Sequence, residues 1–411
     1  MLDLHAFTGH VVRQRSARRV VAPPYDALDP RTREAVAATD PDSYLGALPP
    51  GTARDRGALE MALTRCRDHL TTLLAAGRYR PIGAPCVGVL ELRSGAGGPP
   101  ATAIIGDVPV AAFGDGRVLP HERVDSDRVD QLARYLEVVG VASSPIALTQ
   151  EPDREVTAAT RAATSATTPD VAFRADDGVD VGFWCVTGSA LGDRLRAAVD
   201  GAGVAYIADG HHRAAAAARY AASTGAGPED AAGRVLCAVM PTDHLDVRAF
   251  HRRVDDVVTS DGAADAILDR LRRAGVPLTP VASPRSPDQP HTVTLVLDGS
   301  WWHADVRTLV RDEDVVEALD VRLVERDLLP LLQQRGRPVP VAVPVPAPLG
   351  LGALVRPGTV GIALYPPTIE HILAVAREGR TVPPKTTYVA PKLRSGLLVT
   401  LRPAPGVGTP P

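Results

Sequence analysis

The sequence predicts an α/β protein, because apolar stretches of strand length alternate with segments of helical periodicity. Residues 86–92, 101–110 and 234–240 are compact apolar stretches of the kind that form buried strands. Between the second and the third, residues 126–139 carry apolar side chains at spacings of three and four, which is the pattern of an amphipathic helix. Asp125 or Ser126 can cap this helix and Gly140 can end it. This alternation favours the α/β (α+β) class.

The other elements follow from the same signals. We expect helices over 55–76, 211–222 and 263–273, strands over 144–148 and 204–208, and a hairpin of 292–297 with 301–306. Residues 151–180 are polar and weakly patterned, and we treat them as part of an insertion near 149–203. Proline alternates with valine and alanine over 338–348, which predicts an extended connector and not a central strand.

The length of 411 residues exceeds what one compact core normally holds. We expect an N-terminal α/β segment over 1–100, a nucleotide-binding core over 101–255, and a C-terminal α/β domain over 256–411 that carries a lysine-containing loop.

The charge balance excludes some function classes. Lys and Arg number 45 against 48 Asp and Glu, a net charge of −3. Without a basic field, we expect neither nucleic acid nor a membrane as partner. No apolar stretch has the length of a signal peptide or a membrane span, so we expect a cytoplasmic protein. The four cysteines match no metal-binding or disulfide spacing and are interpreted as reduced thiols.

Lysine is almost absent from the chain. Lys385 and Lys392 are the two lysines among 45 basic residues, so the other 43 are arginines. Where lysine is so rare, two of them seven residues apart suggest a place that needs a compact ammonium group. Chance survival of two lysine codons is the alternative.

The segment Asp209-Gly210-His211-His212-Arg213 has the composition of an anion site. It follows an apolar strand and opens an alanine-rich helix, so its backbone N–H groups can point at one anion. The Arg213 guanidinium suits phosphate oxygens, and one histidine can donate to a phosphate. Asp209 can hold Mg²⁺ through a nucleotide or act on a substrate hydroxyl. The plainer alternative is that Asp209 caps the helix and the histidines lie on the surface.

Two further motifs carry polar groups that can do chemistry. Glu122, in His121-Glu122-Arg123, precedes the clearest helix and can act as a general base, although alone it is more often an ordinary first-turn acid. Residues 382–396 hold both lysines with Thr386 and Ser395, and can clamp a phosphate or a carboxylate. His251-Arg252-Arg253 is a weaker anion candidate, at even odds with a solvated basic face.

Taken together, these motifs resemble the core of the ParB/sulfiredoxin-like fold and, within it, the free-serine kinases. The similar residues are His121-Glu122-Arg123-Val124, Arg128-Val129, Leu132, Gly140, Pro145-Ile146 and Asp209–Arg213. The resemblance implies that Glu122 is the general base and that Gly210, His211, His212 and Arg213 bind nucleotide phosphates. The roughly 85 residues between the two motifs exceed what that compact core needs, which is why an insertion is expected.

The whole chain also resembles a large bacterial and archaeal family known by a domain-of-unknown-function label. The shared signature is Pro23-Pro24-Tyr25-Asp26, His121-Glu122, Asp209–Arg213 and Pro384-Lys385-Thr386-Thr387-Tyr388 with Pro391-Lys392 and Ser395-Gly396. The proline-rich stretch from 336 to 358 departs from the regular structure that we would expect there.

From these motifs we expect an enzyme, an ATP- or ADP-dependent kinase that uses Mg²⁺ and phosphorylates the hydroxyl of a small amino acid. Free L-serine is the expected acceptor and O-phospho-L-serine the product. Glu122, Asp209 and His211 are the expected catalytic residues, and His121, Lys385, Thr386, Lys392 and Ser395 the substrate-binding ones. The alternatives are a phosphoserine phosphatase or other phosphoester hydrolase, and a non-catalytic ParB-like nucleotide switch. A homodimer is a candidate assembly.

Overall fold

The computed structural model describes most of the chain, in two compact units. The described residues are 1–24, 30–51, 55–95, 99–188, 190–258, 260–311, 314–334 and 336–406. Unit 1 comprises Met1–Pro120, Val124–Leu245 and Pro391–Pro411, and unit 2 comprises His121–Arg123 and Asp246–Ala390. Tyr25 and Asp26 of the N-terminal motif lie outside the described residues. The three-domain division stays a prediction.

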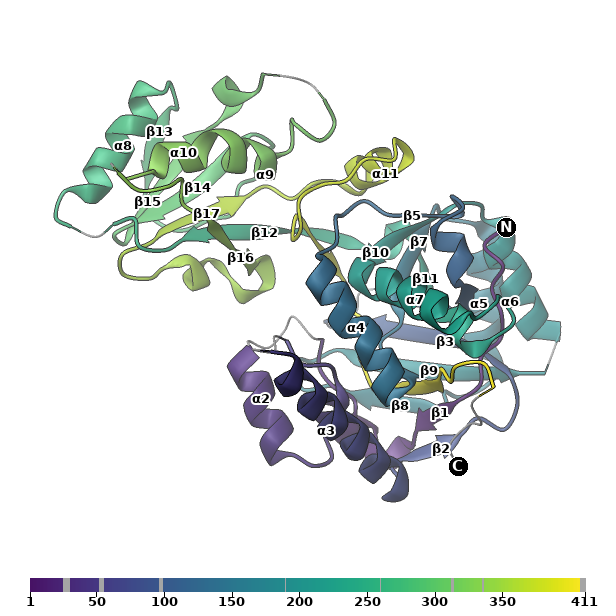
Figure 1. Ribbon diagram of the computed structural model, residues 1–411. Coiled ribbons are helices and arrows are strands. Elements are labelled where there is room, and N and C mark those ends of the chain that lie inside the picture. Colours follow the sequence, from purple (N-terminus) through teal and green to yellow (C-terminus); the bar gives the residue numbers. More distant parts are fainter. Residues whose placement is uncertain are drawn as a thin grey trace. The chain divides into compact units, whose positions relative to one another are not determined.

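Unit 1 is built on a mixed eight-stranded sheet of order β5-β10-β7-β11-β4-β3-β9-β8 (Figure 1). Its strands are β3 (Cys86–Arg93), β4 (Ala101–Pro109), β5 (Val118–Leu119), β7 (Ile146–Gln150), β8 (Val171–Arg174), β9 (Asp180–Thr187), β10 (Ala205–Asp209) and β11 (Arg234–Pro241). The β10–β5 and β11–β7 pairs are parallel, and the other pairs are antiparallel. Strands and helices thus share one unit, and the predicted α/β class is confirmed.

A smaller antiparallel sheet of order β2-β1-β19-β6 completes the strands of unit 1. Its members are β1 (His10–Val12), β2 (Tyr79–Pro81), β6 (Val141–Ala142) and β19 (Leu398–Leu401). Because β19 pairs with β1 and β6, the C-terminal segment of the chain is part of unit 1.

The helices of unit 1 are α1 (Ala17–Val20), α2 (Pro30–Thr39), α3 (Arg56–Ala75), α4 (Ser126–Val139), α5 (Arg154–Ala166), α6 (Ala190–Gly201) and α7 (His211–Thr224). Helix α4 follows the predicted caps: the Asp125 side chain accepts from the Arg128 N–H at 2.8 Å, and Gly140 takes a left-handed conformation. Helices α4 and α7 pack side by side through Val129 and Ala216 (Figure 1).

The stretch near 149–203, expected to be an insertion, is regular in the structure. It forms α5, β8, β9 and α6, and β9 pairs with β3 from Cys86 to Arg93. Its residues Val156, Ala159 and Leu195 are buried in the same apolar core as the central strands. The segment therefore contributes one edge of the main sheet.

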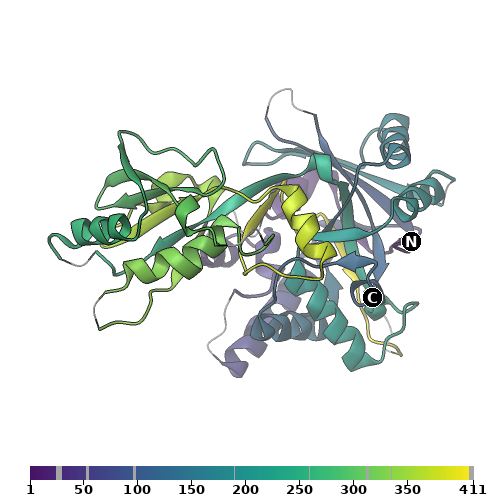
Figure 2. The ribbon, with the colours of Figure 1, turned by 90° about the horizontal axis from the view of Figure 1, so that it is seen from above.

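Unit 2 holds an antiparallel seven-stranded sheet of order β13-β15-β14-β17-β12-β16, in which β18 also pairs with β12 (Figure 1, Figure 2). Its strands are β12 (Asp246–Val254), β13 (Leu278–Val281), β14 (Thr292–Leu297), β15 (Ser300–Asp305), β16 (Ala342–Pro346), β17 (Val360–Leu364) and β18 (Thr387–Ala390). Its helices are α8 (Ala263–Arg273), α9 (Asp320–Leu323), α10 (Leu329–Leu332) and α11 (Ile369–Arg377). A π-helical turn, Val324–Leu328, joins α9 to α10.

The structure tests two local expectations for unit 2, the hairpin of 292–306 and the extended proline-rich stretch of 338–348. The predicted hairpin is β14–β15, and both Asp298 and Gly299 at its turn have positive φ, as a type I′ turn requires. The proline-rich stretch is extended and is not a central strand, as expected, but it is more than a connector: its strand β16 pairs with β12 at the edge of the sheet, where the missing N–H groups of Pro344 and Pro346 are tolerated.

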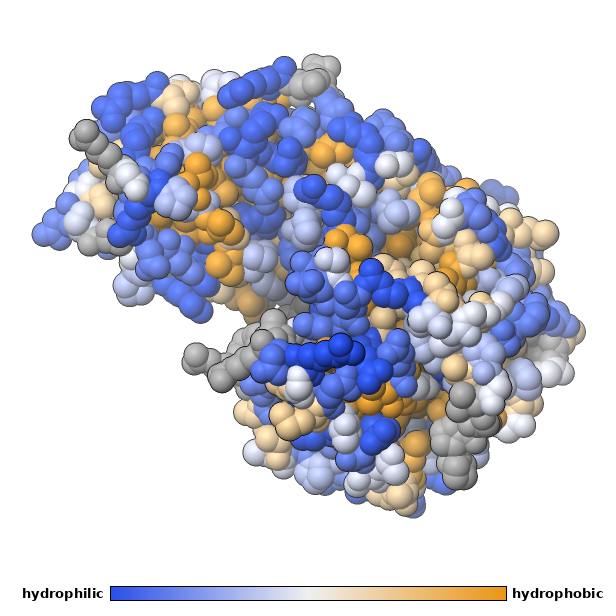
Figure 3. All heavy atoms as spheres, viewed as in Figure 1, coloured by the Kyte–Doolittle hydropathy of each residue, from blue (hydrophilic) through white to orange (hydrophobic). Residues whose placement is uncertain are grey.

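The surface has ordinary character. On the face shown in Figure 3, hydrophilic side chains cover most of the surface and apolar ones form small separate groups, as is usual for folded proteins. No helix in the described part of the chain is long and apolar enough to cross a bilayer.

Candidate functional site

The turn between β10 and α7 in unit 1 has the geometry that the sequence predicts for an anion site. Strand β10 ends at Asp209, and α7 begins at His211. Between them Gly210 has φ 105°, and a Cβ there would lie 3.0 Å from the Arg213 guanidinium. Glycine is therefore needed for the backbone conformation and for the close approach of Arg213. The first N–H groups of α7 have no acceptor within the helix and so point out of its N-terminus.

The Asp209 carboxylate lies between two cations. Its Oδ2 accepts from Nη2 of Arg213 at 2.7 Å, and its Oδ1 accepts from Nζ of Lys392 at 2.8 Å. The Lys392 side chain is only 8% exposed, whereas that of Asp209 is 35% exposed, so the ammonium is shielded from bulk water and the carboxylate remains partly accessible. One of the two rare lysines therefore lies at the predicted turn, 183 residues away in sequence.

Arg213 is also anchored to the main chain. Its Nη1 donates to the carbonyl oxygens of Ser144 and Pro145 at 2.8 and 2.6 Å. These bonds hold the guanidinium over Gly210, so Arg213 shapes the turn in addition to any contact with a phosphate. The predicted phosphate-binding role stays a prediction.

The two histidines of the turn differ in environment. His211 is buried, whereas the His212 ring faces the start of α4, where its Nε2 accepts from the Asp125 N–H at 3.0 Å. An Nε2 that accepts a hydrogen bond requires a neutral ring with its proton on Nδ1. Through this hydrogen bond, His212 connects the predicted anion site to Asp125, the N-cap residue of α4.

Residues 392–396 are held in place by side chains from several parts of unit 1. The Ser395 and Ser144 hydroxyls are 2.5 Å apart, and the Arg394 guanidinium pairs with Asp177 at 2.5 Å. Gly396 has φ 82°, and a Cβ there would lie 2.4 Å from the Tyr44 ring, so only glycine fits. The motif around Lys392 thus consists largely of anchors for the loop that carries the lysine.

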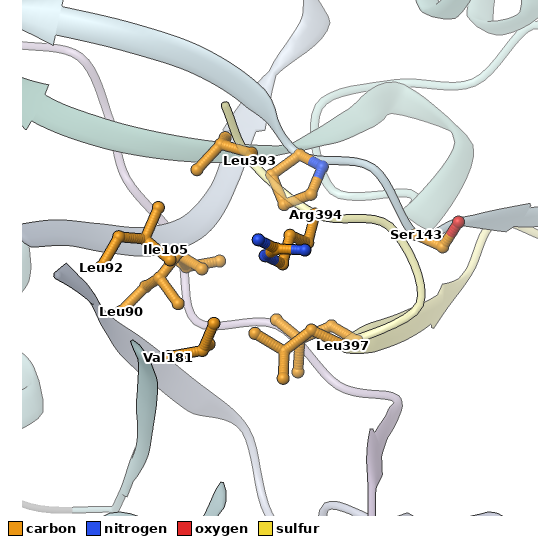
Figure 4. A pocket seen from close by; sticks show the side chains of 10 residues that line it. Leu90, Leu92, Ile105, Ser143, Val181, Leu393, Arg394 and Leu397 are labelled. Atoms are coloured by element: carbon orange, nitrogen blue, oxygen red, sulfur yellow. The ribbon is translucent and has the colours of Figure 1, made fainter. Parts of the chain in front are cut away.

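Arg394 occupies the pocket shown in Figure 4. The pocket is lined by the apolar side chains of Leu90, Leu92, Ile105, Val181, Leu393 and Leu397 (Figure 4). Its remaining volume is ≈ 10 Å³, about one water molecule. The Arg394 guanidinium thus fills this space. The pocket holds the loop that carries Lys392 in place through Arg394, and it is not a ligand site.

A second cavity lies between α4 and α7, with Arg213 in its wall. Its volume is ≈ 80 Å³, and Tyr135 and Tyr220 line it. This is smaller than the cavity of about 150 Å³ that holds benzene in a well-studied case. A nucleotide therefore cannot occupy it without a large rearrangement, and the outer face of the turn is the better candidate for phosphate.

In unit 2 the structure joins two other sequence motifs. The Val382 N–H donates to the His121 carbonyl at 2.8 Å, so residues 121–123 run beside Val382. The fully buried His121 ring lies with Nε2 3.3 Å from the Thr387 hydroxyl. Glu122 is thereby held next to the segment that carries Lys385, although some 260 residues separate them in sequence.

The Lys385 loop has an unusual conformation. Lys385 has φ 57°, in the left-handed region that favours glycine, and its ammonium lies 5.2 Å from the centre of the Phe250 ring. The next residue, Thr386, is buried and donates its hydroxyl hydrogen bond to the Pro383 carbonyl at 2.7 Å. The prediction that Lys385 and Lys392 serve one site stays a prediction.

The segment His251-Arg252-Arg253 in unit 2 is buried. From the sequence, an anion contact and a solvated basic face are equally favoured for it, and in the structure the Arg252 side chain is only 3% exposed. It donates to the carbonyl oxygens of Phe250 and Lys385, each at 3.1 Å, and to Glu325 at 3.1 Å. Burial lowers the pKa of the neighbouring His251 to about 4, so that ring is neutral. The interpretation as a solvated face is wrong for Arg252.

A protein-held metal does not fit the described residues well. In the part of the chain that the structure describes, no group of three His, Cys, Asp or Glu residues is placed to hold a metal ion. Both oxygens of Asp209 already face cations. Mg²⁺ at Asp209 therefore remains a prediction that depends on a bound nucleotide.

Comparison of this chain with known proteins identifies its family and finds solved structures of low similarity. No curated protein matches the chain in sequence. Solved structures with some similarity include C-terminally truncated SbnI from Staphylococcus aureus, at 14% identity and a TM-score of 0.39 over 72% of this chain and 87% of that one. A free serine kinase in complex with AMP has 13% identity and a TM-score of 0.33 over 70% and 87%. A conserved hypothetical protein from Pyrococcus furiosus has 13% identity and a TM-score of 0.34 over 70% and 90%.

A protein-family model gives the firmer result. The model described as "Protein of unknown function (DUF1015)" matches residues 4–322. The match runs through the His121-Glu122 motif and the Asp209–Arg213 turn and covers most of the chain. The chain therefore belongs to the DUF1015 family.

Proposed function

We propose that this protein is a nucleotide-dependent phosphotransferase. It would transfer a phosphoryl group from ATP or ADP to the hydroxyl of a small amino acid, with free L-serine as acceptor and O-phospho-L-serine as product. The observation that carries the proposal is the turn at the N-terminus of α7, where Lys392 and Arg213 flank Asp209. This turn and the motif resemblance support the proposal, whereas the weak likeness to solved structures adds nothing to it.

The turn supplies what a nucleotide phosphate needs. The N–H groups in the first turn of a helix have no acceptor within that helix, and together with the helix dipole they favour an anion at its N-terminus. Arg213 carries five N–H donors, three of which make the bonds described above. An incoming phosphate can compete with Asp209 for Arg213, because this cation is already in place. Phosphoryl transfer depends mostly on such positioning and charge neutralisation.

Glu122 is the proposed general base for the acceptor hydroxyl. Only Arg123 and Val124 separate it from Asp125, whose N–H bonds to His212 of the turn. A carboxylate can take the hydroxyl proton as the oxygen attacks the phosphorus. Asp209 and His211 are the other proposed catalytic groups, and their contribution is to the bound phosphates.

The remaining groups of the proposal bind the substrate and the metal. His121, Lys385, Thr386, Lys392 and Ser395 are the proposed residues for the amino acid. A lysine ammonium is suited to its carboxylate. Mg²⁺ would arrive with the nucleotide and neutralise phosphate charge, with Asp209 as the candidate protein ligand once Lys392 pairs with the acceptor carboxylate.

A substitution at Glu122 separates this proposal from its alternatives. Glu122→Gln keeps the size and polarity of the side chain but cannot accept a proton, so turnover should fall by about 10² to 10⁴ while nucleotide affinity is retained. Glu137→Gln is the matched control, because Glu137 is an acid of α4 that pairs with Arg134. Near-normal turnover of Glu122→Gln would leave Glu122 without a catalytic role, since it also lies before the first turn of α4. Release of phosphate from O-phosphoserine without nucleotide would support the hydrolase, and nucleotide binding without any turnover would support the switch.

A further inference from the structure

Unit 2 contains a buried arginine that the proposed reaction does not use. Arg252 lies in β12, and its guanidinium bonds to two main-chain carbonyls and to Glu325. Glu325 belongs to the π-helical turn Val324–Leu328, an irregularity that often marks functional positions. A buried charge is costly unless it is fully hydrogen-bonded, so a specific arrangement must hold it there.

One of these bonds fixes an unusual backbone. Arg252 Nη1 donates to the main-chain oxygen of Lys385, the residue with φ 57°. A non-glycine residue in this region keeps its conformation only when its surroundings enforce it. The bond from Arg252 is therefore part of what holds the Lys385 loop in place.

Arg252 also interacts electrostatically with Glu122, the candidate general base. Burial lowers the pKa of Arg252, and the carboxylates of Glu325 and Glu122 raise it. The attraction is mutual, so the guanidinium favours the ionised form of Glu122. Glu122 lies beside Val382, three residues before Lys385, so one arginine acts on both motifs.

We propose that Arg252 is the positioning residue of the phosphotransfer site, because its guanidinium fixes the main chain at Lys385, in the segment that runs beside Glu122. This inference rests on the proposed function. Arg252 touches neither substrate nor phosphate: it acts through the Lys385 loop and through the charge of Glu122.

The test compares Arg252→Gln, Arg252→Lys and a control at the next residue. Arg253 is the matched control because it is about as buried on the same strand, but its guanidinium pairs with Asp255 at 2.7 Å. Two quantities are measured for each variant: hydrogen exchange of the backbone over 383–390, and the pH dependence of kcat for phosphotransfer.

We expect Arg252→Gln to raise exchange over 383–390 by about tenfold or more, since a charge-assisted hydrogen bond is lost. The acidic limb of its kcat profile should move to higher pH, because Glu122 loses a neighbouring positive charge. Arg252→Lys keeps the charge but not the forked geometry. Arg252→Lys should therefore have the pH profile of the wild type but still show raised hydrogen exchange over 383–390. Arg253→Gln should change neither quantity.

The outcomes separate this inference from the proposed function. Unchanged exchange and an unchanged profile in Arg252→Gln, with an active wild-type protein, would overturn the positioning role and leave the phosphotransfer proposal intact. Equal effects of Arg252→Gln and Arg253→Gln would mean that Arg252 contributes only to the general stability of unit 2, and this result would also overturn the positioning role. If the wild type transfers no phosphoryl group, the proposed function fails, and the exchange measurement still decides whether Arg252 anchors the loop.

Discussion

Asp320 in unit 2 should contribute a pH dependence to the stability of that unit that is opposite in sign to the one usual for a carboxylate. Its side chain is 5% exposed, at the start of α9, and accepts from the His291 N–H at 2.8 Å. Burial raises the pKa of its carboxyl to about 7. Burial also lowers the pKa of His291, whose Nδ1 lies 3.3 Å from the carboxylate, so this ring supplies no positive charge near neutral pH.

The sign and size of the effect follow from linkage between protonation and folding. In the unfolded chain the carboxyl has a pKa of about 3.9. Between about pH 4 and pH 7 the folded protein therefore holds a proton that the unfolded chain has released. The contribution of Asp320 to the free energy of unfolding therefore falls as pH rises through this window and levels off above about pH 7. The lowered pKa values of His251 and His291 contribute in the opposite sense, so the Asp320 contribution is isolated by comparing the wild type with a variant at this position. The full effect is about 4 kcal/mol, at about 1.4 kcal/mol for each pKa unit.

Asp320→Asn keeps the shape and the acceptor oxygen but cannot ionise, so this pH slope should disappear. The variant should match the wild type near pH 4 and be more stable by up to about 4 kcal/mol at pH 8. Urea unfolding followed by the fluorescence of Trp301 and Trp302 in β15 reports on unit 2, with Trp184→Phe in both proteins to remove the signal of unit 1. Asp305→Asn is the control, because Arg307 lowers the pKa of Asp305 and its loss should act in the opposite sense. Parallel pH curves for Asp320→Asn and wild type would refute this reasoning.

Two further predictions concern the turn in unit 1 and the lysines. Arg213→Ala should weaken nucleotide binding roughly 10- to 150-fold, from a loss of about 1.5–3 kcal/mol. It should also lower Tm, because the Ser144 and Pro145 carbonyls lose their donor; unchanged affinity in calorimetry would leave Arg213 a structural residue. Lys392→Arg and Lys385→Arg should each reduce turnover with little change in Tm, since charge is kept while shape and hydration change. Full activity after either exchange would mean that the rarity of lysine has no functional meaning there.

Local signals predicted much of the fold, and long-range pairing supplied the rest. The ends of helix α4 can be predicted from the sequence to within a residue, because its capping residues and its apolar face lie in one continuous segment of the chain. The weak pattern of 151–180 concealed α5 and β8, because their burial depends on strands far away in sequence. Strand preference of this kind is set by neighbours in the sheet more than by the residues themselves.

The candidate site shows the same division. The strand, glycine and helix at Asp209–Arg213 are local and could be predicted, and the scarcity of lysine pointed to Lys392 but not to its partner. Arg252 and Arg253 are adjacent in β12, so their side chains point to opposite faces. One bonds to the Lys385 carbonyl and the other to Asp255. Sequence alone could not tell which face each would take.

The most direct test of the central claim is the mass of the acceptor after incubation with the protein, Mg²⁺ and nucleotide. L-serine, L-threonine and L-homoserine are each supplied with ATP or with ADP, and the products are analysed by mass spectrometry. The proposed function predicts that one acceptor, with serine expected, gains one phosphoryl group in step with loss of nucleotide, and that Glu122→Gln abolishes the gain. Nucleotide that binds at the Asp209–Arg213 turn and is never consumed, with every hydroxy amino acid unchanged in mass, would contradict it.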